Sequence, residues 1–428
     1  MRIHWVIPAL ICFVAVPLLA QSPHEPELKG YVTRVASAAV IDVNGIHVRV
    51  DDKTQLYLLT DKTSALTSAQ EWKPYVGQAA KVYGKLLKTE GAITASEIDL
   101  RRQARHEVSG SGVVDALLPV AADAPPESHL LRADGYPVLV TEQTLLDFQP
   151  PVTATTAFQT NVWITFHGIQ RTDGVVIASN ASFRENSMDK EEEELRIKTE
   201  HDPSMVDLTA RQKGLSKVFH GVDPKRIPPY NNPAMQSRVR SIGEKLVPKY
   251  QRELAATDET KIEFRFQVVM EDGWRESVAW PNGIILVPRH VVWSMQNDAQ
   301  LAAVLADNIA CVLEGQTLHT LPAMHTTIAE DAVGGQAIIL VQDTGINPIP
   351  WLFRKAHNSG IDQVLPDKRE QRARVSLALM NDAGYDVNEA PLAWWALADQ
   401  KSAGLQRVRL PDRSVYLYKI LGETWHKE

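Results

Sequence analysis

The sequence predicts a multidomain protein in which a β region precedes an α+β region: two small β-barrels followed by a mainly helical domain. Three observations lead to this fold class, namely a diverged internal repeat with strand-like alternation in the first half, a charged stretch after it, and helical periodicity from residue 234 onward. The chain has 428 residues, 44% of them hydrophobic and 23% charged, which suits several globular domains.

The overall charge limits the class of partner. The 52 Asp and Glu residues outnumber the 45 Lys and Arg residues, so the formal net charge is -7 at pH 7. A chain without an excess of basic residues has no broad positive field to attract phosphate backbones. We therefore expect no nucleic-acid partner.

The N-terminus has the features of an export signal, which we assign to residues 1–20. Arg2 precedes an apolar run from Trp5 to Ala20. Because the run is shorter than the roughly 20 residues of a bilayer span, we expect cleavage after Ala20 and a periplasmic or secreted protein. The alternative is an uncleaved signal, which would be the protein's contact with a membrane.

The cysteine content bears on how the mature protein is held together. The chain has two cysteines, and Cys12 lies within the predicted signal peptide. The remaining Cys311 cannot form an internal disulfide, so the fold depends on its hydrophobic cores.

Two segments of the first half repeat one pattern. Residues 45–54 (GIHVRVDDKT) match residues 135–144 (GYPVLVTEQT) at Gly, both Val and Thr. A second match follows in the same order, TEG with a later AS in one copy against TDG with a later AS in the other, downstream of Gly84 and Gly168 respectively. Asn-Gly and Asp-Gly pairs mark hairpin turns between alternating runs. Each copy therefore predicts about five strands.

A closed barrel removes the sheet edges of such a short repeat, and the pattern resembles the OB-like barrels of bacterial envelope proteins. That resemblance implies binding of oligosaccharides, peptides or nucleic acids, with a structural spacer as the default role. The predicted division of the mature chain is barrel repeat 1 at 28–104, barrel repeat 2 at 105–186, a charged linker at 187–229 and a final domain at 230–428.

The final domain opens with an α+β order of elements. Apolar residues at helical spacing predict a helix from residue 234 to 247, and alternation predicts a strand over 262–269. A Pro-Asn-Gly turn within 277–287 predicts a hairpin, and a further helix begins near Asp298.

That further helix carries the most informative stretch, Leu301 to Gln316. Its Leu-Ala-Ala-Val-Leu-Ala, the strand and glycine-bearing turn at Trp280 to Val287, and Ala-Gly-Tyr-Asp at 383–386 resemble the HtpX and CAAX-prenyl-protease type of zinc metallopeptidase. The resemblance covers roughly residues 233–386 and implies a metallopeptidase-like domain with endopeptidase ancestry.

The resemblance also implies catalytic residues that this sequence has replaced. The family uses two histidines one turn apart, a glutamate beside the first that accepts a proton from zinc-bound water, and a third ligand from another helix. The histidine positions hold Asp307 and Cys311, and the base position holds Asn308. An ungapped count from Ala-Gly-Tyr-Asp places the third ligand at Arg369 and its supporting aspartate at Ala373.

A different ligand set stays open. A one-residue shift of that count gives Glu370 and Arg374, and Asp307, Cys311 and Glu370 could then hold zinc. However, an amide at Asn308 cannot accept a proton, and loss of a general base costs about 10²–10⁴-fold in rate. Under the ungapped count Arg369 would instead pair with Asp307. We therefore predict no metal cofactor and no proteolysis.

The leading functional hypothesis is an exported, catalytically inactive metallopeptidase homologue that binds a protein or peptide, or acts as a scaffold, in the cell envelope. If binding persists, the strand before the motif helix would receive a peptide by edge pairing; otherwise it is a core strand. The residues of this candidate contact strand are Gly283, Ile284, Ile285, Leu286 and Val287. The alternatives are a zinc endopeptidase with Asp and Cys ligands, and a structural or glycan-binding envelope protein that acts through its barrels.

Overall fold

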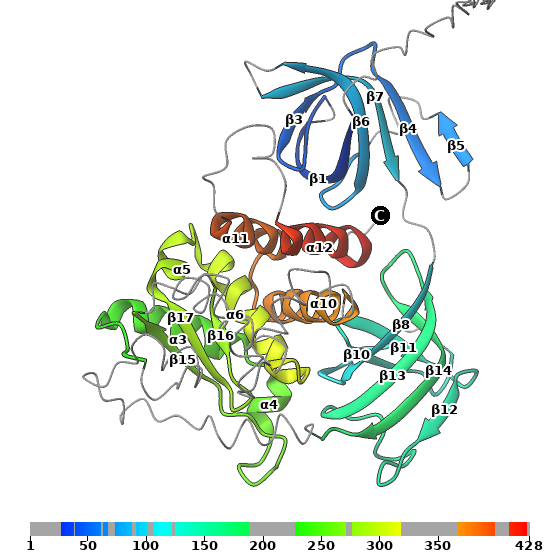
Figure 1. The fold of residues 1–428 in the computed structure, drawn as a ribbon. Coiled ribbons are helices and arrows are strands. Elements are labelled where there is room, and N and C mark those ends of the chain that lie inside the picture. The colour runs from blue at the N-terminus through cyan, green and yellow to red at the C-terminus, as the bar shows by residue number, and fades with distance from the viewer. Residues whose placement is uncertain are drawn as a thin grey trace, which may run out of the picture.

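The computed structural model describes residues 27–37, 39–60, 63–66, 73–87, 91–101, 106–121, 125–187, 227–270, 276–317, 366–398 and 411–425. The predicted signal peptide and all but the ends of the predicted charged linker lie outside these residues. Within them, a β-rich region comes first and an α+β region follows, as the sequence predicts (Figure 1). Among the described residues, no helix is both long and apolar enough to cross a membrane.

The first β-rich unit, called barrel 1 here, is a closed circuit of strands. β1 pairs with β2 and β6, β2 with β3, and β3 and β6 both pair with β7, which closes the circuit. β4 continues along the same edge of β7 as β3, and β5 pairs with the outer edge of β4. The strands are β1 Glu27–Ser37, β2 Val40–Val43, β3 Ile46–Arg49, β4 Gln55–Thr60, β5 Thr63–Leu66, β6 Ala79–Leu87 and β7 Ala92–Arg101. Their inward aliphatic residues form a separate core.

The second unit, barrel 2, repeats this circuit. β8 and β9 together take the place of β1, because β8 pairs with β13 and β9 pairs with β10. β10 pairs with β11, and β13 pairs with β14. β11 and β12 both pair with β14 in parallel. The strands are β8 His106–Val113, β9 Ala116–Leu118, β10 His129–Ala133, β11 Tyr136–Val140, β12 Leu145–Phe148, β13 Val162–Gln170 and β14 Val176–Glu185. Barrel 2 also has its own core.

The repeated sequence letters make matching contacts in the two units. The hydroxyl of Thr54 donates to the carbonyl oxygen of Ala95 at 2.9 Å, and the hydroxyl of Thr144 donates to that of Ala178 at 2.9 Å. Both glycines that follow in the repeat, Gly84 and Gly168, lie at a break in strand register. The small residue suits a bulge, because a Cβ there would collide with the neighbouring strand.

The α+β domain is built around one buried helix, α6. Its N-cap, Asn297, accepts a hydrogen bond from the backbone N–H of Gln300, and nearly every residue from there to Leu313 is buried. The remaining elements are α3 Pro233–Leu246, α4 Lys249–Glu253, β15 Arg265–Val269, β16 Val278–Ala279, β17 Ile284–Pro288, α5 Arg289–Ser294, α6 Asp298–Leu313, α10 Pro366–Asp382, η4 Val387–Glu389, α11 Ala390–Leu397, α12 Asp412–Ile420 and η6 Leu421–Trp425. The helix predicted to begin near Asp298 begins there.

The structure corrects the prediction that Gly283 to Val287 form a peptide-contact strand. β17 is the middle strand of a three-stranded sheet, parallel to β15 on one side and antiparallel to β16 on the other. Ile284 to Val287 are almost fully buried, and Gly283 lies in the preceding turn with a φ of 83°. Since both edges of β17 are occupied, it cannot receive a peptide by edge pairing, and the core-strand alternative is the observed one.

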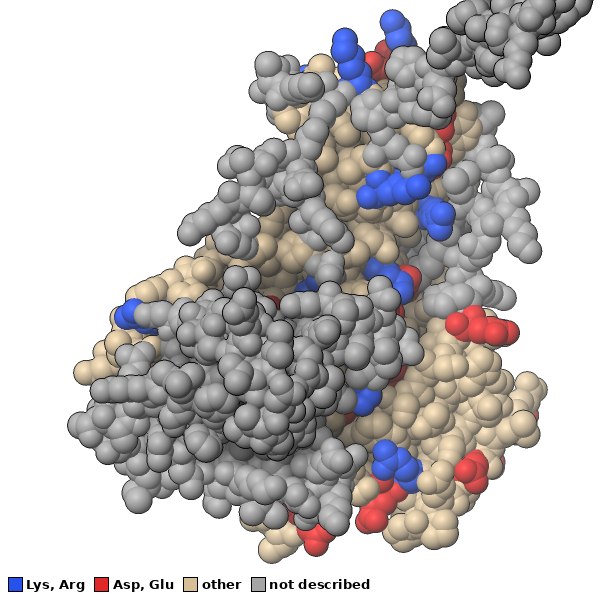
Figure 2. All heavy atoms as spheres, viewed as in Figure 1, with Lys and Arg blue, Asp and Glu red and all other residues tan. Residues whose placement is uncertain are grey.

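Helices of the α+β domain lie between the two barrels (Figure 1). The β2–β3 turn of barrel 1 lies against Trp395 of α11, and the equivalent β10–β11 turn of barrel 2 lies against Arg374 of α10. Barrel 1 also approaches the backbone of α12 at Gly77, where an added Cβ would lie 2.4 Å from the Tyr418 carbonyl oxygen. On the face in Figure 2, the described residues show scattered charges of both signs and no broad basic field.

Candidate functional site

The motif positions lie on a buried stretch of α6. Asp307, Asn308 and Cys311 are 8%, 6% and 2% exposed. Small residues on α6, such as Ala306 and Ala310, allow the neighbouring helices to pack closely. These three side chains are therefore enclosed by residues of α10, α11 and α12.

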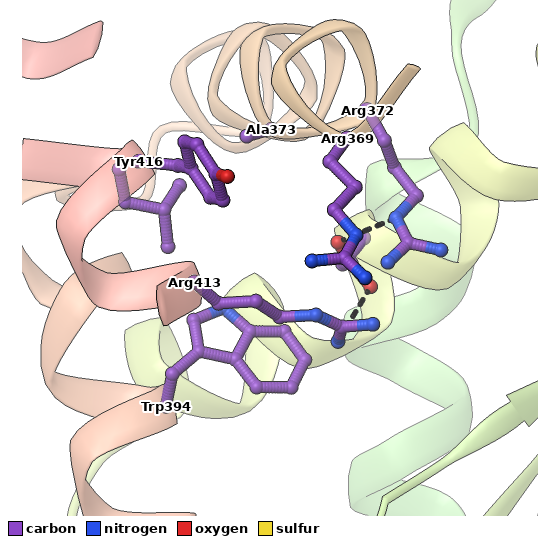
Figure 3. Close-up of a pocket in the computed structure, with 8 residues that line it drawn as sticks. Arg369, Arg372, Ala373, Trp394, Arg413 and Tyr416 are labelled. Carbon is purple, nitrogen blue, oxygen red and sulfur yellow. Dashed lines mark hydrogen bonds and ion pairs between the residues drawn. The ribbon is translucent and has the colours of Figure 1, made fainter. Parts of the chain in front are cut away.

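Asp307 lies between two guanidinium groups (Figure 3). Arg372 Nε on α10 is 3.1 Å from Asp307 Oδ1, and Arg413 Nη1 on α12 is 3.3 Å from Asp307 Oδ2. Arg413 also contacts Glu276 at 3.0 Å and lies over the ring of Trp394. Both oxygens of the carboxylate thus face positive charge.

The surroundings of the Arg372 guanidinium favour its charged form. Burial alone would lower the pKa of Arg372, but the charge of Asp307 and the contact with Cys311 raise it overall. Arg372 therefore stays charged at neutral pH. The side chains of Asp307 and Cys311 both face this cation.

Asn308 has a structural role at the position where the sequence resemblance implies a catalytic base. Its Nδ2 donates to Ser277 Oγ at 2.6 Å and to the carbonyl oxygen of Val304 at 2.8 Å. The amide N–H groups are thereby used to connect α6 to the start of the β16 segment. Such a group offers no basic lone pair for a water proton.

The residues predicted at the third-ligand region separate onto two faces of α10. Arg369 and Ala373 line a small pocket with Asp307, which has room for about one water molecule. Arg372, three residues further along the same face than Arg369, pairs with Asp307. The sequence could suggest an arginine there, but it could not fix which one.

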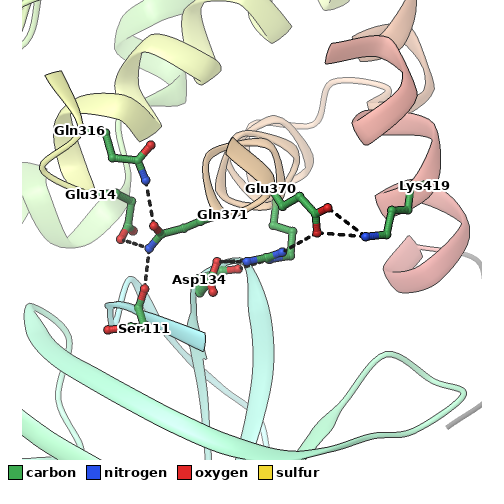
Figure 4. Close-up of polar contacts among 8 residues, drawn as sticks. Ser111, Asp134, Glu314, Gln316, Glu370, Gln371 and Lys419 are labelled. Carbon is green, nitrogen blue, oxygen red and sulfur yellow. Dashed lines mark hydrogen bonds and ion pairs between the residues drawn. The ribbon is translucent and has the colours of Figure 1, made fainter. Parts of the chain in front are cut away.

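Glu370 and Arg374 lie on another face of α10. Lys419 Nζ donates to Glu370 at 2.9 and 3.1 Å, and Arg374 is 3.8 Å from the same carboxylate (Figure 4). Residues two apart on a helix point about 200° apart, so Glu370 faces away from the side that carries Arg372. The alternative ligand set of Asp307, Cys311 and Glu370 is therefore not brought together. Within the described ranges, no group of three or more His, Cys, Asp or Glu side chains could hold a metal ion.

A second polar cluster joins α10 to barrel 2, and sequence reasoning missed it (Figure 4). Arg374 Nε donates to Asp134 Oδ1 at 3.1 Å and to its carbonyl oxygen at 2.9 Å. Gln371 Nε2 donates to Glu314 at 2.8 Å and to the carbonyl oxygen of Ser111. The one available signal was the Asp-Gly turn, which predicts a hairpin but not its partner.

Burial dominates the protonation of this cluster. It raises the pKa of Asp134 to about 6, although Arg374 opposes the shift. Burial also raises the pKa of Glu314 well above its ordinary value, and the charges of Asp134 and Asp115 add to the effect. Burial therefore favours the neutral form of Glu314 within a cluster that joins two domains.

Comparison with known families identifies part of one barrel. Residues 29–99, which cover most of barrel 1, match DUF5666, described as a domain of unknown function. No curated protein matches the chain. The matched range ends before β8, so the family corresponds to a single copy of the repeated barrel.

Proposed function

We propose that the protein is an exported, catalytically inactive metallopeptidase homologue that serves as a protein-binding scaffold in the cell envelope. The observation that carries the proposal is the enclosure of Asp307 by Arg372 and Arg413, with the amide of Asn308 bonded to Ser277. A zinc ion needs several donors directed at one point, whereas this carboxylate is directed at two cations. Export rests on the N-terminal residues alone.

The arrangement of strands supports the scaffold part of the proposal. We infer that both barrels are OB-like, because each has the circuit of a five-stranded Greek-key barrel with one parallel closing pair. Each barrel packs a hairpin turn on the helices. The retained peptidase-like helices then hold two binding modules at fixed positions, which explains why the domain persists without its chemistry.

The catalytic part is tested by elemental analysis of the full mature chain, before and after incubation with zinc, together with cleavage assays on casein. We expect no stoichiometric zinc and no cleavage. One zinc per chain that Asp307→Ala removes and Glu276→Gln retains, accompanied by cleavage, would show that the proposal is wrong. Glu276 is the matched control because it also pairs with Arg413 but lies outside the motif.

A further inference from the structure

The edge strand β12 of barrel 2 differs from its counterpart in barrel 1. β12 pairs with β14 along one edge, and no strand among the described residues pairs with its opposite edge. The counterpart β4 pairs with β7 in the same way, but β5 pairs with its opposite edge from Tyr57 to Thr60, the counterparts of Asp147 to Pro150. Strand register shows which residues of the two barrels are equivalent. Gln55 lies opposite Glu97 in barrel 1, and Leu145 lies opposite Asn180 in barrel 2, so Leu145 is the counterpart of Gln55.

The backbone of β12 presents hydrogen-bonding groups at this open edge. Gln149, directly after the strand, donates its N–H to the carbonyl oxygen of Phe183 in β14 at 2.8 Å. Because successive residues of a strand direct their backbone groups to opposite edges, the N–H and C=O groups of Leu146 and Phe148 point to the open side. Pro150 limits the open edge to a short segment.

Two large apolar side chains are exposed on β12, next to the charged Asp147. Leu145 is 75% exposed and Leu146 is 41% exposed. Proteins usually protect an open edge with charged residues or proline, whereas barrel 2 places leucine where barrel 1 has Gln55. Two exposed leucines beside backbone groups that no described strand pairs with are a surface suited to a partner strand.

We propose that the open edge of β12 binds an extended segment of another protein, which adds as an antiparallel strand beside β12 in the way that β5 adds beside β4. The segment is short, exchanges main-chain hydrogen bonds with Leu146 and Phe148, and places uncharged side chains opposite Leu145 and Leu146. This inference deepens the binding part of the proposed function and rests on it.

A second copy of the chain is a poorer occupant of this edge. If two β12 strands paired antiparallel through Leu146 and Phe148, each Asp147 would lie directly opposite the other. Like charges at directly opposed positions destabilise a strand pair. A partner segment without an acidic residue at that position avoids this repulsion.

The test uses the full mature chain and a labelled synthetic peptide, Asp61 to Ser68, which contains the β5 sequence. Binding is measured by fluorescence anisotropy, with two backbone-methylated peptides as probes of strand register. Because Thr63 and Ala65 of β5 lie opposite the outward-facing Thr60 and Leu58 of β4, methylation at these two residues should abolish binding. Methylation at Ser64 and Leu66 should leave binding intact.

Variants of the protein locate the site. Leu146→Pro removes an outward N–H and should weaken binding by about tenfold, as expected for one unmade hydrogen bond. Leu145→Gln, which introduces the residue of barrel 1, should also weaken binding and tests the edge without a backbone change. Ile169→Lys is the control, because Ile169 is exposed on β13, away from this edge, and Lys85 is its counterpart in barrel 1.

Three outcomes would overturn the inference: no binding of the unmethylated peptide, equal binding of both methylated peptides, or a dimer in sedimentation that Leu146→Pro dissociates. The last would make a second copy the occupant. These outcomes are independent of the zinc and casein assays, because no variant in this set touches α6. If the protein bound zinc and cleaved casein but also bound the peptide, only the catalytic part of the proposed function would be wrong.

Discussion

The two barrels share one circuit of strand pairings, but the polar side chains in their equivalent hairpin turns form hydrogen bonds with different partners. In barrel 1, Asn44 Oδ1 accepts from the backbone N–H of Tyr31 at 3.0 Å, and its Nδ2 donates to the carbonyl oxygen of Lys29 at 2.9 Å. In barrel 2 the equivalent residue is Asp134, which accepts from Arg374 of α10. An amide in the first turn is thus satisfied within its own barrel, while a carboxylate in the second connects its barrel to the helices.

The strand before each turn also forms its ion pair within the barrel in barrel 1 but extends its ion pairs to the helices in barrel 2. Asp42 of barrel 1 pairs with Arg34 of the same barrel at 2.7 Å. Its counterpart Arg132 in barrel 2 pairs with Asp115 at 2.7 Å and, through both terminal nitrogens, with Asp382 at the end of α10. Barrel 2 is therefore held by buried charges that depend on the helical domain, and barrel 1 by packing and close backbone approach.

The largest effect expected from this contrast is that of Arg374→Met. The substitution leaves Asp134 buried without its cation, and removal of one partner of a buried pair costs about 3–5 kcal/mol. The free energy of unfolding, measured with urea, should fall by that amount, and amide exchange should rise first in β10 and β11. Lys419→Met is the control, because the partly exposed pair with Glu370 contributes less than about 1 kcal/mol. Equal losses for the two variants would contradict the proposed dependence of barrel 2 on Arg374.

A smaller difference is expected between alanine substitutions in the two turns. Gly45 and Gly135 have φ values of 75° and 70°, so alanine is strained at both by about 1–2 kcal/mol. At Gly135 the new Cβ would also lie 2.5 Å from the backbone carbon of Arg374, which cannot move aside. At Gly45 it meets the end of the Trp395 side chain, which can rotate. Thermal unfolding should therefore show Gly135→Ala as the less stable variant, and the reverse order would sink this account of the turns.

The pH dependence of stability should also come from barrel 2. The pKa of Asp134 is about 6 in the folded protein, against 3.8 for an ordinary Asp. Between these values the folded state binds more protons than the unfolded state, so the free energy of unfolding falls as pH rises from about 4 to 6, by on the order of 1–3 kcal/mol. Glu314 and Asp115, whose pKa values burial also raises, contribute with the same sign.

Asp134→Asn isolates this contribution, because it gives barrel 2 the amide that barrel 1 has at Asn44. Urea unfolding of both proteins at several pH values should show a smaller slope in the variant. A variant with an unchanged slope would assign the pH dependence to other groups.

The sequence predicted what lies within a barrel better than what lies between domains. Gly84, Gly168, Thr54 and Thr144 are constrained by contacts inside one small sheet, so their pattern survived the divergence of the two copies and exposed the repeat. The contact between Asp134 and Arg374 joins positions 240 residues apart and leaves no local pattern. Nothing near either residue signals the other.

The motif helix shows a second limit. Helical periodicity locates α6 well, and Asp307, Asn308 and Cys311 were readable at once as the residues of interest on it. Arg372, which faces Asp307 and Cys311, was not readable, because it lies on another helix and the sequence does not show which residues of that helix point at α6. The open edge in barrel 2 was likewise unreadable, since the sequence shows that a strand exists but not which neighbour is missing.

The smallest expected effect tests whether the two barrels are alike where the repeat says they are. Thr54→Val and Thr144→Val each remove a hydroxyl that donates to an alanine carbonyl at the same distance and accepts from the backbone N–H of Asp51 or Thr141, which costs on the order of 1 kcal/mol. The two losses, measured by urea unfolding with hydrogen exchange to assign each to its barrel, should agree within about 0.5 kcal/mol and add in the double variant, since the sites share no partner. A markedly larger loss at Thr144 would mean that the helical domain strains barrel 2 even at a contact wholly inside it.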